Sequence, residues 1–362
     1  MTSDVYYPEQ RHLLPLSLIR RERLLPDGIQ GEIETAPGAR VAMRDVIARA
    51  IAPAPYVILD AVAALRLRNA DALTALLWVV EGDTVAVDQV LAGKSKGRGK
   101  RLLSPINGTV VSIANGRIIL QEFPESINLE AGLNGQVVAI SRGRGAVIET
   151  YGAVAQGVWG NHKRAVGTLR SEPDEGLESI YRNVIETQYR GVIVVTKRPL
   201  TAISLRVMED QGLSGIIAPS MVPELIEHAL RAPGPIMLTE GFGTQRMSSA
   251  RFQFLDDFDG YQALLDATMP APLETRRPEA IINVPLRTGE RPRPANLDQV
   301  LQEGMIVLLA RGDQAGTVGQ IVRLPKTPVV LDNGLRVACA EVELITGETM
   351  NVPLANLEIS GQ

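Results

Sequence analysis

The chain has 362 residues, 45% of them hydrophobic, so it is long enough to form several domains, each with its own core. Its formal net charge of -4 excludes a surface built throughout for nucleic acid, so any such contact must be local. Aromatic residues make up only 4%, whereas 33 glycines and 23 prolines favour short strands and tight turns. We therefore expect a β-rich, multi-domain protein.

The N-terminal segment and the cysteine content indicate the cellular compartment of the protein. Residues 1–26 lack an uninterrupted apolar core of signal-peptide length, and no later segment holds about eighteen consecutive apolar residues. The single cysteine, Cys339, has no second thiol with which to form a disulfide, a redox pair or a metal site. These features predict a soluble, cytoplasmic protein without membrane contact, in which residues 1–29 form an N-terminal arm.

Short repeated units characterise residues 30–170, which we expect to be a β-rich region. Residues 36–48 match residues 80–92 in a turn glycine, a valine three positions later and a closing apolar triplet. A second pair, 106–113 and 133–140, shares an Asn-Gly flanked by β-branched residues. Asn-Gly favours a type I′ hairpin turn, because both central positions of that turn need positive φ.

The order of three segments resembles the biotinyl/lipoyl-like barrel-sandwich family over about residues 76–121. EGDTV (81–85) would form its first turn and strand, VLA (90–92) follows, and SPINGTV (104–110) would form the return strand. Carrier members of this family display a modified lysine in an Ala-Met-Lys-Met or Glu-Thr-Asp-Lys-Ala setting within the intervening hairpin. Neither setting is present here, so we expect no lipoyl or biotin modification.

The hairpin position is occupied by GKSKGRGKR (93–101). It is not a phosphate loop, because Asp88 stands where the Walker motif needs its first glycine, and β-type residues follow instead of a helix. Two interpretations remain open, a solvated hairpin tip and a local site for an anionic partner, either RNA or an acidic protein, where clustered cations gain from counterion release. The candidate polyanion-binding residues are Lys94, Lys96, Arg98, Lys100 and Arg101.

Residues 145–170 are glycine-rich and are expected either to complete the barrel or to lead out of it. We predict that His162 is a surface residue of a loop. Trp159 is predicted to be a packing anchor, with base stacking as the alternative because Lys163 and Arg164 follow it.

Residues 171–267 change to an α/β pattern. Helices are predicted at 177–190, 200–212 and 222–232, and buried strands at 191–195, 215–220 and 235–243. This alternation is typical of a parallel sheet covered by helices. The unit resembles the swivelling domains that carry a phosphorylated histidine, but His228 lies in a predicted helix, so only the fold is carried over.

Ligands of parallel sheets bind beyond the carboxyl ends of the strands. Here those ends place polar and glycine residues together, which makes them a candidate pocket. The candidate pocket residues are Thr196, Ser220, Thr239, Glu240, Gly241, Gly243 and Arg246. The alternative is that the glycines form a turn and that Glu240 serves as a cap.

The C-terminal part begins with a linker rich in proline and arginine at 268–298, in which EAIINVPL (279–286) is the segment able to pair as a strand. Residues 299–362 return to strands, with Gly316 and Gly319 at a turn and a hairpin at Asn333-Gly334. This order resembles the KOW-type Src-homology-3-like barrel of ribosomal proteins and transcription elongation factors, which implies contact with RNA or with protein. Acidic residues outnumber basic ones here, which favours a protein partner.

The sequence contains no clear catalytic motif. Three separated histidines and one cysteine have no metal-ligand spacing, and adjacent Asp256 and Asp257 are expected on a solvated face. We therefore assign no catalytic, cofactor-binding or metal-ligating residue. The sequence favours a noncatalytic cytoplasmic adaptor of a macromolecular assembly that binds a protein partner and has some association with RNA, transcription or translation. The alternatives are a metabolite-binding enzyme or sensor with its pocket at the strand ends, and a direct nucleic-acid binder that uses residues 93–101.

Overall fold

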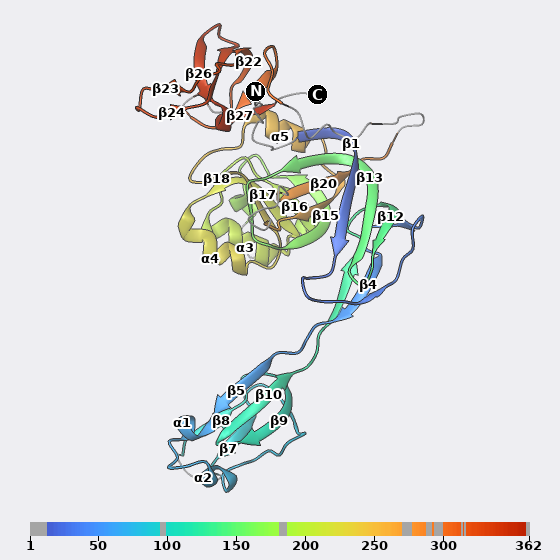
Figure 1. The fold of residues 1–362 in the computed structure, drawn as a ribbon, viewed down its shortest axis with the longest axis vertical. Helices are drawn as coiled ribbons and strands as arrows, with labels where there is room; N and C mark the ends of the chain where they lie inside the picture. Colours follow the sequence, from blue (N-terminus) through green and yellow to red (C-terminus); the bar gives the residue numbers. More distant parts are fainter. Residues whose placement is uncertain are drawn as a thin grey trace.

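The computed structural model describes residues 13–94, 99–180, 187–269, 277–286, 292, 300–312, 314 and 316–359. As expected, this part of the chain is β-rich and forms several sheets. Figure 1 shows a central body, a module that projects from one end of it, and a C-terminal unit at the other end. We call residues 13–51 and 126–283 the body, residues 56–122 the projecting module and residues 300–359 the C-terminal unit.

The first half of the body is built on a long antiparallel pair. β1 (Leu13–Leu24), within the segment expected to be an arm, pairs with β13 (Gly145–Gln156) along most of its length. The remaining strands of this half are β2 (Glu32–Ile33), β3 (Arg40–Val41), β4 (Val46–Ile51), β11 (Ser126–Glu130) and β12 (Gly135–Ser141). Their inward side chains, including Ile47 and Ile148, form one buried cluster with Leu264 and Ile281.

The second half of the body contains parallel strands with helices. β15 (Arg164–Ser171), β16 (Val192–Val195), β17 (Gly215–Met221) and β18 (Ile236–Phe242) pair in parallel in this order. The three strands predicted from the sequence are thus present. β14 (Trp159–Gly160) adds an antiparallel edge beside β18.

The helices of this half are α3 (Ala202–Gln211), α4 (Ile226–Arg231) and α5 (Ser249–Asp256). α3 begins at a capping box between Thr201 and Ser204 and ends at Gly212, whose φ is 66°. The helix predicted at 222–232 begins as the 3-10 turn η3 (Pro223–Leu225). The helix predicted at 177–190 is wrong in its described parts, which are the 3-10 turns η1 (Leu177–Ile180) and η2 (Thr187–Tyr189).

Two strands join the halves into one sheet. β19 (Gln262–Asp266) pairs with β15 and with β20 (Glu279–Asn283), and β20 pairs with β13. β20 is the strand that the sequence indicated within the predicted linker, and four of its five residues are buried. The parallel strands and the long antiparallel pair therefore share a continuous backbone hydrogen-bond network across the expected boundary at residue 170.

The projecting module has its own core, which contains Leu91, Val110, Ile118 and Leu120, all fully buried. A four-stranded antiparallel sheet contains β5 (Tyr56–Asp60), β10 (Arg117–Glu122), β9 (Gly108–Ala114) and β6 (Thr84–Val85), in this order. The other elements are α1 (Ala61–Leu65), α2 (Asp71–Thr74) and the pair β7 (Val90–Gly93) and β8 (Arg101–Leu103). The chain enters and leaves through two adjacent segments, so the module extends away from the body (Figure 1).

The hairpin turn of the module is not where the sequence interpretation placed it. The Asn-Gly pairs at 107–108 and 134–135 have no positive φ, and each glycine begins a strand. At the first of these glycines an added Cβ would lie 2.0 Å from the carbonyl oxygen of Gln121, so close backbone approach explains it. The turn between β9 and β10 is formed by Asn115 and Gly116, with φ of 53° and 76°.

The C-terminal unit is an antiparallel sheet around a core that includes Val307, Ile321 and Leu357. Its strand order is β26 (Thr349–Pro353), β25 (Cys339–Leu344), β22 (Val318–Arg323), β21 (Ile306–Leu309) and β27 (Leu357–Ile359). β23 (Val329–Val330) and β24 (Arg336–Val337) form the expected Asn-Gly hairpin, and η4 (Leu354–Asn356) precedes β27. No helix among the described residues is both long and apolar enough to cross a membrane.

We predict that Gly108→Ala lowers the free energy of unfolding by about 1–3 kcal/mol, because its Cβ would force apart the backbones of β9 and β10. Thermal and urea denaturation measure the change. Val111→Ala, on an exposed position of β9, is the matched control and should cost less. Equal losses in the two variants would contradict the close-approach explanation.

Candidate functional site

The parallel strands end at one edge of the sheet and bring several predicted pocket residues together. Thr196, Ser220 and Thr239 are buried there, and β17 and β18 remain paired at Ser220 and Gly241. Thr196 donates a hydrogen bond to the carboxylate of Glu172 at 2.7 Å, and Ser220 donates to the carbonyl oxygen of Gln245 at 2.7 Å. These hydroxyl groups hold the loops at the strand ends.

A cavity of about 590 Å³ lies between this edge and the C-terminal unit. Of the predicted pocket residues, Glu240, Gly241 and Arg246 line it, whereas Thr196, Ser220, Thr239 and Gly243 do not. The body contributes residues around β14 and β18 and the start of α5, and the C-terminal unit contributes residues 308–312, Gly316 and Glu358. Its size falls in the range of small-molecule sites.

The floor of this cavity contains a buried ion triad that the sequence did not predict. Arg251, with a side chain 1% exposed, donates from Nη1 to Oε1 of Glu240 at 2.6 Å and from Nη2 to Oε2 of Glu358 at 2.5 Å. Nη1 also approaches the carbonyl oxygen of Thr239 at 3.4 Å. We call Arg251, Glu240 and Glu358 the Arg251 triad.

Secondary-structure periodicity accounts for the directions of two members of the triad, Arg251 and Glu358. Arg251 lies one helical turn before Leu255 on α5, so both side chains face the sheet. On β27, Leu357 enters the core of the C-terminal unit and the next residue, Glu358, therefore points to the opposite side, towards the body. No local sequence signal marks a contact between residues 107 positions apart, such as Arg251 and Glu358.

The electrostatics of the triad favour permanent charge. Burial alone would disfavour the charged guanidinium, but Glu358 and Glu240 outweigh this effect, and the pKa of Arg251 is raised above its ordinary value. Arg251 therefore stays protonated and neutralises much of the field of Glu240. Since Glu240 and Glu358 both accept hydrogen bonds from this permanently charged group, the triad joins the body to the C-terminal unit.

The surroundings of the cavity are partly aromatic. Trp159 packs against the core of the parallel-sheet half and meets Phe242 edge-on, with ring centroids 5.6 Å apart. It is thus a packing anchor, as predicted, and it also lines the cavity. His162 is an exposed loop residue with φ of 62°, as expected. Asp256 accepts a hydrogen bond from Ser171, so it is less solvated than predicted.

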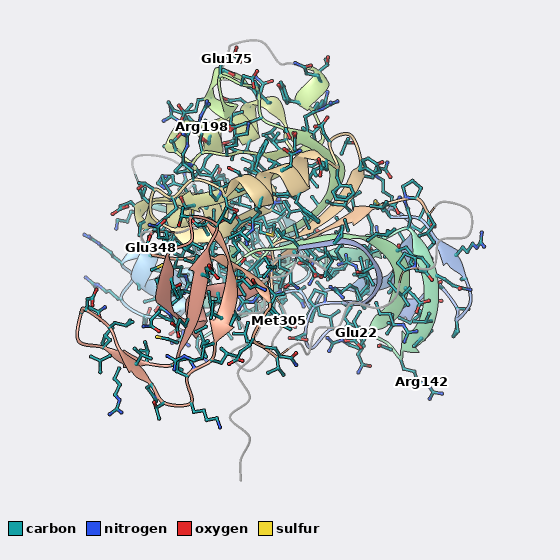
Figure 2. All side chains as sticks on the ribbon, turned by 90° about the horizontal axis from the view of Figure 1, so that it is seen from above. Glu22, Arg142, Glu175, Arg198, Met305 and Glu348 are labelled. Carbon is teal, nitrogen blue, oxygen red and sulfur yellow. The ribbon has the colours of Figure 1, made fainter. Side chains whose placement is uncertain are left out.

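Figure 2 looks at the molecule from the end that carries the C-terminal unit, on which Met305 and Glu348 are labelled. Glu175 and Arg198, beside the loops at the strand ends, lie on a different side of the view from Arg142, which belongs to the antiparallel half of the body. The strand-end edge and the antiparallel half are therefore separate surfaces.

The described basic residues of 93–101 belong to the projecting module, which extends from the body on the side opposite the C-terminal unit and thus away from this cavity (Figure 1). Lys94, Lys100 and Arg101 are exposed, whereas Lys96 and Arg98 lie outside the described residues. The structure also brings Trp78, which no sequence pattern singled out, against this hairpin. The candidate pocket and the candidate polyanion site are thus two separate places on the protein.

Comparison of the sequence with protein-family models and with curated proteins gives no match. The site must be interpreted from its own geometry.

We predict that Arg251→Met lowers the free energy of unfolding by about 3–5 kcal/mol, because it leaves two carboxylates buried beside each other. Denaturation in urea measures the loss, and limited proteolysis should show earlier release of the C-terminal unit. Arg323→Met is the matched control, since Arg323 forms an exposed pair with Glu341 and should cost no more than about 1 kcal/mol.

Adding Glu240→Gln and Glu358→Gln to Arg251→Met removes the two carboxylate charges that Arg251 no longer balances, and should restore part of the stability. If the triple variant is as unstable as the single one, poorer packing rather than the broken charge pairing would be the main cause.

Proposed function

We propose that the protein is a noncatalytic adaptor of a cytoplasmic macromolecular assembly, in which the joined body and C-terminal unit support the projecting module as a docking element. The observation that carries the proposal is the Arg251 triad. It commits Glu240, the carboxylate in the best position for chemistry at the strand ends, to a joint between two parts of the chain. The strand-end hydroxyls at Thr196 and Ser220 are engaged in local hydrogen bonds as well.

The shapes of the three parts support this function by resemblance. The small sheets around one core at 56–122 suit a barrel-sandwich module, the parallel strands with α3 and α4 suit a swivelling-like α/β unit, and the five-stranded antiparallel sheet suits a KOW-like barrel. Such barrels commonly dock onto RNA or protein in transcription and translation. Under this proposal the acidic C-terminal unit meets a protein, in agreement with its charge.

The projecting module presents an apolar surface that suits a protein partner. On β5, an edge strand of its sheet, Tyr56 is 60% exposed and Ile58 is 61% exposed. Phe123, where the chain returns to the body, is also exposed. Large exposed apolar side chains on an edge strand are costly unless something covers them, which favours a partner protein with an apolar face at β5.

We predict that the double substitution Tyr56→Ser and Ile58→Ser removes a stoichiometric protein from complexes isolated with the full chain from the source cells. The interface loses its apolar contacts, while the side chains removed are exposed, so the melting temperature should change little. Val138→Ser and Leu230→Ser, on exposed apolar positions of the body, form the matched control and should retain the partner.

Retention of the same partner by the double variant would remove β5 as the docking surface. A purified chain whose mass in solution doubles, and returns to one copy in the double variant, would show that a second copy covers β5 and would contradict the adaptor.

A second candidate function is a metabolite sensor or enzyme, which the cavity of about 590 Å³ favours. Its lining includes Arg246 and Arg311, so a carboxylated or phosphorylated metabolite is the ligand class to test. A ligand at about 100 times its Kd should stabilise the protein by about 2.7 kcal/mol, seen as a raised melting temperature. Arg246→Ala should abolish that rise, with Arg206→Ala on α3 as the control. A rise that depends on Arg246 would replace the adaptor by the sensor.

A further inference from the structure

Trp78 lies in an unusual setting for one of only two tryptophans in the chain. It is 49% exposed, although its neighbours Val79 and Leu91 are buried in the core of the projecting module. Its indole Nε1 donates a hydrogen bond to the carbonyl oxygen of Gly93 at 2.9 Å, and its backbone N–H bonds to the carbonyl oxygen of Leu91 at 2.9 Å. The ring is therefore held in place while a large part of it faces solvent.

Gly93 brings a cation to this ring. Its φ is 145°, and an added Cβ would lie 2.9 Å from the carbonyl oxygen of Lys100 and 3.1 Å from Cγ of Arg101. The missing side chain leaves room for the stem of Arg101, whose guanidinium carbon lies 5.9 Å from the centre of the Trp78 ring. A glycine at this position thus permits an aromatic ring and a guanidinium group to lie beside each other.

Two more cations belong to the same hairpin. Lys94 and Lys100 are exposed, and an added Cβ on Gly99 would lie 3.2 Å from Cβ of Lys94, so the start of the Lys94 side chain lies across the hairpin. Within the part of the chain that the structure describes, Lys94, Lys100 and Arg101 make no ion pair with a carboxylate. Their charge is available to a ligand.

The charge of the chain is unevenly distributed. Residues 56–122 contain eight basic and six acidic residues, whereas the whole chain has a net charge of -4. The remainder of the protein therefore has a formal net charge of -6 (-4 minus +2), which disfavours contact with polyanions. This charge distribution favours the approach of a polyanion to the projecting module, and within the module to the hairpin that carries these three cations.

We propose that Trp78, Lys94, Lys100 and Arg101 form a binding site for single-stranded nucleic acid. A base stacks on the open part of the Trp78 ring, and the three cations contact the flanking phosphates. The exposed ring favours single strands over duplexes, because stacking on a side chain needs a base that is free of its own stack. The site is separate from β5 and does not depend on the proposed protein docking.

Fluorescence anisotropy with the full-length protein tests this inference, with labelled oligo-U, oligo-dT and a duplex of equal length, each of about twelve nucleotides, as probes. Both single strands should bind more tightly than the duplex, and the stronger of the two identifies RNA or DNA as the ligand. Trp78→Ala should weaken binding at least about tenfold, whereas Trp78→Phe should retain most of it. Trp159→Phe, at the other tryptophan, is the aromatic control and should bind as the unmodified chain does.

Salt dependence tests the cations. Changing Lys94, Lys100 and Arg101 to Gln should reduce the slope of log K against log salt by about 0.7 for each phosphate that the variant no longer neutralises. Arg117→Gln, an exposed cation on β10 of the same module, should leave the slope unchanged. The melting temperatures of all variants are compared, and the Phe and Gln variants keep the test valid if Trp78→Ala fails to fold.

Three results would overturn the proposal: no binding of either single strand at a low salt concentration of about 50 mM, equal binding of the duplex, or single-strand binding that is unaffected by Trp78→Ala. Binding of poly-glutamate that displaces the oligonucleotide and is insensitive to Trp78→Ala would identify an acidic protein as the ligand instead.

Discussion

The Arg251 triad is the interaction on which the arrangement of the protein depends. One guanidinium group from α5 bridges the end of β18 and the last strand of the C-terminal unit, and so links the elements around two hydrophobic cores. In a buried ion triad of this kind, the desolvation of three charges offsets much of their attraction, so the net contribution to stability is small. The triad is one contact between the C-terminal unit and the body, and the cavity beside it is lined by residues of both parts.

The projecting module, at the opposite end of the molecule, is attached to the body in a different way. The projecting module encloses its own core and is connected to the body through two adjacent chain segments, so little of its surface is covered by the body (Figure 1). Because of this separation, the apolar surface at β5 and the basic hairpin of β7 and β8 beside Trp78 both belong to the projecting module alone. The body, with its continuous sheet, supplies a fixed attachment for both.

Much of the fold could be predicted from sequence because it depends on local pattern. The short, mostly apolar segments at 191–195 and 215–220 indicate buried strands independently of the tertiary contacts around them. The Asn-Gly pairs were less informative, because a glycine required for close backbone approach at Gly108 looks the same in sequence as a glycine required for positive φ at Gly116. The candidate site was predicted only in part. Glu240 was identified, but the partner that determines its role, Arg251, approaches through tertiary packing that no local spacing encodes.

The position of β20 has a consequence for how the chain acquires its structure during synthesis. β20 lies between β13 and β19, so the large sheet cannot close until the ribosome has made residues well beyond the parallel strands. β1 likewise waits for β13, more than a hundred positions later, whereas the projecting module is one contiguous segment whose pairings are local. The module can therefore fold while the body is still incomplete, and its exposed apolar and basic surfaces form before the body to which it is attached.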